Sequence, residues 1–277
     1  MKGLWLALGF LTVIPVRRLA PQPGDPSTLP PSGVAGQALG RAAMWFPLIG
    51  FALGLMLAVA HLFFSCLFPP LLAAALTVAV WATLTGGLHL DGLADCCDGL
   101  LATAQAERRL EIMRDPRLGS FGVIGLTLFV VLKILATASL PSLGAFLPSF
   151  WLVGGLPNTY FPIGIFVLAA SVSRWLIVPV ALQPQARAEG MGAGFARGLT
   201  PPVVALAALV PLAWLILGAL SGTWSVVTAL ALAHLVAAAI VAFARARLGG
   251  VTGDIFGLTV ELTELTLLLV FILQPRI

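Results

Sequence analysis

MWFPLIGFALGLMLAVAHLFFSC, residues 44–66, is an apolar run without a single charged side chain. An α-helix needs about 20 such residues to cross a bilayer, so this run predicts a membrane span. Further apolar runs predict spans at residues 71–88, 120–140, 158–182, 201–219, 224–244 and 255–273. The expected fold is therefore an all-α, polytopic integral membrane helical bundle with about seven transmembrane helices, within a range of about six to eight.

The composition agrees with one membrane-embedded domain over residues 1–277. Hydrophobic residues make up 60% of the chain and charged residues 9%, whereas soluble domains carry roughly 25% charged residues. Residues 1–14 predict a short interfacial or re-entrant segment. Residues 141–157, which Pro and Gly interrupt, predict a loop or a half-helix.

The basic residues gather on one side of the predicted bundle. Twelve of the 15 Lys and Arg residues precede the first span or lie in the loops after the second, fourth and sixth spans. By the positive-inside rule, the N-terminus and these three loops face the cytoplasm. The net charge of +4 therefore reflects topology, and we expect no nucleic-acid partner.

Nine of the 11 acidic residues fall in three blocks on this same face. The first block, TGGLHLDGLADCCDGL at residues 85–100, spaces Asp91, Asp95 and Asp98 as i, i+4 and i+7. On a helix the three carboxylates form one stripe and repel each other unless a cation lies between them. Oxygen ligands at this density suit Mg²⁺. A solvated amphipathic helix is the alternative, but the block lacks the interleaved Lys or Arg that such a helix would carry.

The second block, ERRLEIMRDPRLGSFG at residues 107–122, leads into the third span. Arg114 and Arg117 stand before that helix start, and a helix N-terminus beside glycine and arginine suits a phosphate. Taken alone, the block also fits an ordinary charged loop.

The third block is GGVTGDIFGLTVELTE at residues 249–264. Its glycines leave backbone N–H groups free to approach an anion, which makes Thr252 and Gly253 candidate phosphate contacts. Asp254 either caps the seventh span or joins the metal site. Glu261 and Glu264 lie inside the span, where carboxylates usually face a cavity or the bundle interior.

Three other polar residues lie in or beside the spans. Lys133 and Arg174 are expected to point into the bundle, and Arg174 could pair with Glu261, Glu264 or a phosphate. His89 is a candidate base or hydrogen-bond donor, although a lone histidine is more often structural.

These groups together predict transfer of a phosphorylated group. Mg²⁺ would neutralise a diphosphate and stabilise the leaving phosphate, and a carboxylate or His89 would deprotonate an acceptor alcohol. A CDP-alcohol-type phosphotransferase is an alternative, but its Ala-Arg pair after the second aspartate is missing here. A cation-coupled transporter is another; it predicts acids at mid-membrane on broken helices, whereas most acids here lie at one boundary.

The three blocks resemble the signature blocks of the cobalamin synthase family, also called adenosylcobinamide-GDP ribazoletransferase. Shorter stretches are similar too, in the family's order along nearly the whole chain: FLTVIPV at 10–16, PLIGFALG at 47–54, Ser173-Arg174 and ARAEGMG at 186–192. The chain departs from the family pattern at Cys96-Cys97 and in residues 141–157.

The resemblance implies a Mg²⁺-dependent enzyme of the bacterial inner membrane. It would join α-ribazole, or its 5′-phosphate, to the cobinamide phosphate of adenosylcobinamide-GDP and release GMP. Its partners would be these substrates and the lipid bilayer, with a homo-oligomer or a complex with other cobalamin-assembly enzymes left open. The expected metal ligands are Asp91, Asp95, Asp98 and Asp254. The expected phosphate contacts are Arg114, Arg117, Arg174, Thr252 and Gly253. The expected catalytic residues are Asp91, Asp95, Asp98, His89, Glu261 and Glu264.

Overall fold

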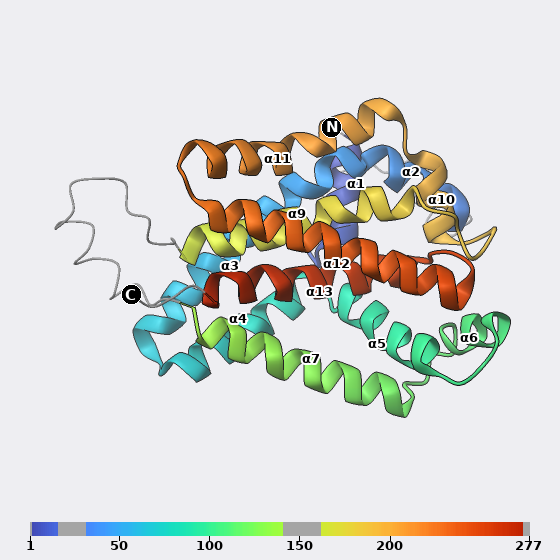
Figure 1. The fold of residues 1–277 in the computed structure, drawn as a ribbon, viewed down its shortest axis with the longest axis horizontal. Helices are drawn as coiled ribbons and strands as arrows, with labels where there is room; N and C mark the ends of the chain where they lie inside the picture. The colour runs from blue at the N-terminus through green and yellow to red at the C-terminus, as the bar shows by residue number, and fades with distance from the viewer. Residues whose placement is uncertain (1, 16–31, 141–161, 274–277) are drawn as a thin grey trace.

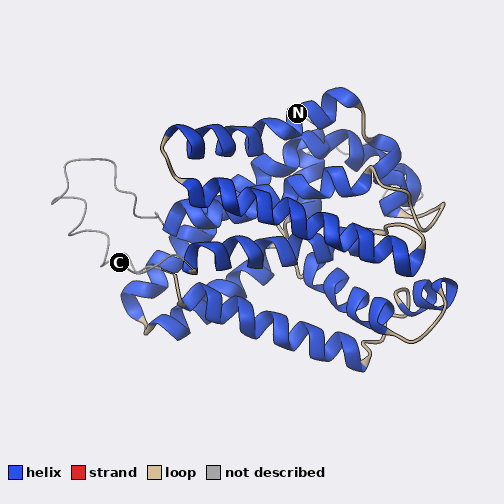
Figure 2. Ribbon diagram, in the orientation of Figure 1, coloured by secondary structure: helices blue, strands red, loops and turns tan. Residues whose placement is uncertain are grey.

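The computed structural model describes residues 2–15, 32–140 and 162–273 of the chain. Helices make up its regular structure throughout these ranges (Figure 2), and the one β-type pairing within them is a parallel bridge between Gln185 and Val251. The predicted all-α class is therefore confirmed. The helices are α1 (Lys2–Leu11), α2 (Ser32–Ala42), η2 (Ala43–Trp45), α3 (Phe46–Leu67), α4 (Pro70–Leu84), α5 (Leu88–Leu101), α6 (Ala106–Ile112), α7 (Ser120–Ala138), α9 (Pro162–Ala181), α10 (Met191–Gly198), α11 (Pro201–Leu220), α12 (Trp224–Leu248) and α13 (Gly253–Ile272).

The long helices lie side by side along the long axis of the molecule (Figure 1). Six helical segments, with α2 and α3 counted as one, are long and apolar enough to cross a membrane, and α4 with α5 makes up to seven. This confirms the predicted bundle of about seven spans. The predicted loop or half-helix at residues 141–157 lies outside the described residues, as do the first residues of the predicted span 158–182.

The second predicted span, residues 71–88, ends earlier than expected. α4 has 15 residues, which is about 22 Å of helix and less than the thickness of the hydrocarbon core. The chain then bends by 92° between α4 and α5. Gly86 and Gly87 make this bend with φ values of 62° and 70°, a left-handed conformation that glycine adopts without a Cβ clash.

α5 leads from the bend toward one end of the bundle, where α6, α10 and the start of α13 also lie (Figure 1). We call this end, with the connecting residues 102–119, 182–200 and 249–252, the charged end. It carries the second acidic block and the loops that the basic residues predict to be on one side.

α1 is a ten-residue apolar helix, too short to span a membrane, as expected for the N-terminal segment. It runs across the direction of the long helices (Figure 1). Ala7 and Leu11 are fully buried, and the Val13 N–H donates to the Leu84 carbonyl oxygen at 2.9 Å. The N-terminal segment therefore docks on the bend that ends α4.

Glycines bring α2 and α10 into backbone contact at the charged end. Gly36 and Gly40 on α2 face Gly194 and Gly198 on α10, each pair separated by three residues. A Cβ on Gly40 would collide with the Phe195 carbonyl oxygen. Small residues at this spacing are typical of close helix packing in membranes, and the contact holds α10 in place.

Four buried charges balance each other inside the bundle. Lys133 Nζ lies 2.7 Å from Glu261 Oε2 and 2.6 Å from Glu264 Oε2. Arg174 pairs with Glu264 Oε1, which the Ser173 hydroxyl also contacts at 3.3 Å. All four charged residues are at most 3% exposed. Lys133 and Arg174 thus point into the bundle, as the sequence predicted.

Removing Lys133 would leave one cation for two buried carboxylates. We expect Lys133→Met to lower the free energy of unfolding by roughly 3–5 kcal/mol, measured by SDS titration in mixed micelles. Adding Glu261→Gln to Lys133→Met should recover part of the loss, because it removes the unpaired charge. The control Arg108→Met breaks an exposed pair with Glu111 and should change stability by less than about 1 kcal/mol. A Lys133→Met protein as stable as this control would contradict the argument.

Candidate active site

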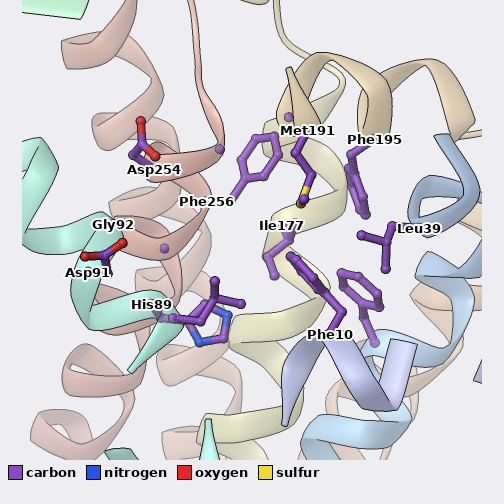
Figure 3. A pocket seen from close by; sticks show the side chains of 15 residues that line it. Phe10, Leu39, His89, Asp91, Gly92, Ile177, Met191, Phe195, Asp254 and Phe256 are labelled. Atoms are coloured by element: carbon purple, nitrogen blue, oxygen red, sulfur yellow. The ribbon is translucent and has the colours of Figure 1, made fainter. Parts of the chain in front are cut away.

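α5 and α13 approach each other through two glycines at the charged end. A Cβ on Gly92 would lie 2.9 Å from the Asp254 carbonyl oxygen, and one on Gly257 would lie 3.0 Å from the His89 carbonyl oxygen. Both distances are shorter than an ordinary Cβ contact, so glycine permits this approach and a larger residue would make the neighbouring backbone shift. The contact places Asp91 and Asp254 on neighbouring helix turns at one side of a pocket (Figure 3).

The carboxylates at this end crowd one another. Asp91 is exposed and Asp95 is half-buried, and neither carboxylate forms a hydrogen bond or ion pair with another described residue. Asp95 lies on α5, which is too short to count as a membrane span by itself. Burial, together with the negative charges of Asp91, Asp254 and Asp98, raises the pKa of Asp95 to about 7. The positive charge of Arg187 offsets part of this negative charge, and the remainder favours a bound cation.

The donor chemistry fits Mg²⁺, which prefers carboxylate oxygens. Within the described ranges, no three His, Cys, Asp or Glu side chains lie close enough together to form a metal cage. Mg²⁺ usually keeps several waters and takes one or two carboxylates together with substrate phosphates, so a preformed cage is not required. The residues therefore fit a metal that arrives with a phosphorylated substrate.

Asp98 has a structural role that its spacing does not predict. Its Oδ2 accepts from the Gly119 N–H at 2.7 Å and its Oδ1 accepts from the Gly122 N–H at 2.8 Å. These N–H groups belong to the start of α7, so Asp98 caps that helix from α5. The Asp98 carboxylate, which continues the predicted stripe of metal ligands, is thus hydrogen-bonded to the start of α7.

Arg187 is a candidate site residue to which the sequence analysis assigned no role in binding or catalysis. Backbone bonds of 2.9 Å from Ala186 N to Val251 O and from Val251 N to Pro184 O hold its loop against the start of α13. The Arg187 Nη1 lies 3.8 Å from Asp254 Oδ2. Burial lowers the pKa of Arg187, Asp254 raises it, and the positive charge of Arg114 lowers it. Asp254 and Arg187 thus form an ion pair, and the positive charge of Arg114 acts on both groups.

The other predicted phosphate contacts divide into two groups. Gly253 lines the pocket, and the buried Thr252 donates its hydroxyl to Asp254 Oδ2 at 3.1 Å. Arg117 instead pairs with Asp115, which lowers the pKa of Asp115 to about 2 through side-chain hydrogen bonds. Arg174 is fully buried in the ion cluster with Glu264.

The predicted catalytic carboxylates Glu261 and Glu264 also belong to that ion cluster. Lys133 contacts both, and Arg174 contacts Glu264. The sequence allowed Arg174 to pair with Glu261, Glu264 or a phosphate, and in the structure it pairs with Glu264. These contacts make the two glutamates part of the bundle interior beneath the aspartates.

The pocket beside Asp91 and Asp254 has a cavity volume of about 180 Å³. His89 lines it, is 3% exposed, and has an Nδ1 atom without a hydrogen-bond partner among the described residues. The opposite wall is apolar (Figure 3). Its side chains come from α1, α2, α3, α9, α10 and α13: Phe10, Leu39, Phe46, Ile177, Met191, Phe195 and Phe256.

Comparison with known proteins identifies the family. Residues 3–272 match the family model described as cobalamin-5-phosphate synthase. The chain belongs to this family. It is 34% identical to the adenosylcobinamide-GDP ribazoletransferase of Desulfitobacterium hafniense, over 97% of this chain and 96% of the relative. It is 36% identical to the protein of the same name from Pseudomonas fluorescens, over 97% and 98% of the two chains. No solved structure matches.

Membership of the cobalamin-5-phosphate synthase family confirms the resemblance drawn from the three sequence blocks. The structure adds a physical reason for parts of those blocks. Gly92 and Gly257 permit the contact of α5 with α13, and a Cβ on Gly250 would lie 2.5 Å from the Pro184 carbonyl oxygen. Glycines of the third block thus serve backbone packing around the site.

The two ends of the aspartate stripe should respond differently to substitution. Asp98→Ala removes a helix cap and should lower the free energy of unfolding by about 1–2 kcal/mol without added Mg²⁺. Asp91→Ala removes one of several repelling charges and should leave stability unchanged or raised. SDS titration of the two purified variants compares them directly. Equal destabilisation by both substitutions would show that Asp98 is not a specific cap.

Proposed function

We propose that the protein transfers the adenosylcobinamide phosphate group from adenosylcobinamide-GDP to α-ribazole, or to its 5′-phosphate, and releases GMP. The names of its relatives support these substrates. The observation that carries the proposal is the pairing of Asp91 and Asp254 at a pocket, with Arg187 beside Asp254. Acidic groups and a half-buried arginine at one rim suit a metal-bound diphosphate.

The diphosphate would lie at the start of α13. Thr252, the N-cap residue, makes no side-chain cap hydrogen bond because its hydroxyl is directed to Asp254. The first N–H groups of α13 are then available to phosphate oxygens, and the helix dipole favours negative charge there. Arg187, whose Nε has no partner among the described residues, and Arg114 would add charge-assisted bonds.

Asp91, Asp95 and Asp254 would supply the acidic groups of the Mg²⁺ site, one or two of them as direct ligands and the rest through water. The ion would neutralise the diphosphate and stabilise the leaving phosphate. Asp98 would not join the metal site, because both of its oxygens accept hydrogen bonds from the start of α7. Glu261 and Glu264 would not join it either, because Lys133 and Arg174 already neutralise them.

His89 Nδ1 would accept the proton from the 5′-hydroxyl of the acceptor, in the tautomer protonated at Nε2. The hydroxyl oxygen then forms a bond to the cobinamide-linked phosphorus. The bond from that phosphorus to the bridging oxygen breaks, and its electron pair leaves with GMP.

We further propose that the charged end faces the cytoplasm of a bacterial inner membrane. The distribution of Lys and Arg supports this orientation. Both proposed substrates are hydrophilic at the reacting groups, and this side would give them access from water.

The first test is GMP release by purified protein in detergent, given adenosylcobinamide-GDP. We expect release to need both α-ribazole and Mg²⁺, and EDTA to abolish it. Release without acceptor would indicate hydrolysis instead of transfer. Full activity in EDTA would contradict the metal role, and no release from folded protein with Mg²⁺ would contradict the function.

A substitution separates the metal role from folding. Asp95→Asn should reduce turnover by about 100-fold or more, while thermal unfolding stays close to that of the parent protein. The matched control is Asp115→Asn, which alters an exposed pair with Arg117 and should keep most activity. An Asp95→Asn protein that turns over normally would exclude Asp95 from the metal site.

A further inference from the structure

The pocket wall opposite the aspartates is a continuous row of aromatic rings. Phe10 and Phe46 are stacked with centroids 6.1 Å apart, Phe46 and Phe195 are 5.5 Å apart, and Phe195 and Phe256 are 5.8 Å apart. The rings come from α1, α3, α10 and α13, so the tertiary fold assembles them. Figure 3 shows Phe10 and Phe195 on the side of the pocket away from Asp91 and Asp254, with Phe256 between them and Asp254.

This wall offers no polar side chain to a ligand. Leu39, Ile177 and Met191 complete it among the described residues. A flat aromatic ring without hydrogen-bonding substituents would lose little hydration free energy when it moves from water to this wall. A purine would lose hydration of its amino or carbonyl groups without compensation, which is a penalty that discriminates between ligands.

The size of the pocket further restricts which ligand can bind against this wall. Its volume of about 180 Å³ is below the roughly 300–1,000 Å³ of sites that enclose drug-sized ligands. One heterocyclic base fits such a space, and a corrin ring does not. The polar groups of the pocket, His89, Asp91 and Asp254, all lie on the other side.

We propose that this aromatic wall is the subsite for the base of the acceptor, and that it selects a benzimidazole-type base over a purine. The assignment rests on the proposed function, because it takes α-ribazole as the acceptor. The base lies against Phe195 and Phe256, and the ribose directs its 5′-hydroxyl toward His89. The guanosine half of the donor stays outside this wall.

Met191 allows a sharp test because it lines the wall and is 44% exposed, so its replacement leaves the packed core intact. Met191→Gln adds hydrogen-bonding groups at nearly constant volume, and Met191→Leu is the matched apolar control. We expect Met191→Gln to raise the KM for α-ribazole roughly tenfold and to lower that for an α-linked adenine riboside. The kcat and the KM for adenosylcobinamide-GDP should change less than about threefold. Met191→Leu, which keeps the wall apolar, should keep the preference for α-ribazole over the adenine riboside.

A second variant, Phe195→Leu, tests the rings themselves. It should raise the KM for α-ribazole with the donor KM unchanged, in protein whose thermal unfolding is first shown to be cooperative. A change in the donor KM instead of the acceptor KM, or no change in either with Met191→Gln, would overturn the subsite while the transferase function stands.

Direct binding separates the two proposals if turnover fails. Equilibrium dialysis of purified protein with radiolabelled α-ribazole needs no donor. If the parent protein releases no GMP, the proposed function is wrong. The subsite then stands only if the parent protein retains α-ribazole and Met191→Gln loses at least about tenfold in affinity, and equal or absent binding overturns it.

Discussion

The site depends on the backbone contact between α5 and α13. Gly92 and Gly257 let the two helices approach until a Cβ on either would press against the partner backbone. A side chain at either position would push apart the helices that carry Asp91 and Asp254, and would shift His89. The contact also has an electrostatic cost, because it brings carboxylates together. Burial is the main reason that the pKa of Asp95 rises to about 7, and the negative charges of Asp91 and Asp254 add to the rise.

α13 carries two sets of acids that differ in how their charge is balanced. Seven residues, or about 10 Å of helix, separate Asp254 from Glu261. Glu261 and Glu264 have Lys133 and Arg174 as partners inside the protein. Among the described residues, Asp254 forms an ion pair with Arg187 alone, at the longer distance of 3.8 Å, and it also experiences the negative charges of Asp91 and Asp95. The charges of Glu261 and Glu264 are thus balanced without a ligand. Asp254 and the aspartates near it keep negative charge that an external cation would balance.

This difference also bears on the transporter alternative. A cation-coupled transporter needs acids near mid-membrane that can take up an ion. Glu261 and Glu264 are in the span as such a mechanism would require, but two cations of the chain itself already bind them. The acids with unbalanced charge lie at the charged end beside the pocket. Catalysis on a substrate bound at the charged end explains both sets of acids better than cation transport does.

Hydropathy was enough to predict most of the fold, because each long apolar run must become a membrane helix. It misplaced the end of the second span, since the bend depends on two consecutive left-handed glycines within an apolar region. Helical spacing grouped Asp91, Asp95 and Asp98 correctly on α5. It could not show that the start of α7 reaches Asp98, because that contact joins residues 21 and 24 positions apart. The aromatic wall was equally hidden, since its rings come from four separate helices.

The small pocket and the large donor together constrain how the reaction would be arranged. On the proposed assignment, the acceptor base fills the cavity and only its ribose reaches the polar side at His89 and Asp91. The corrin cannot enter a space of about 180 Å³, so the donor must present its diphosphate at the rim, where α13 starts. A donor held there covers the opening of the pocket. The acceptor would then have to bind before the donor, and GMP, which leaves from the rim, would have to depart before the larger product.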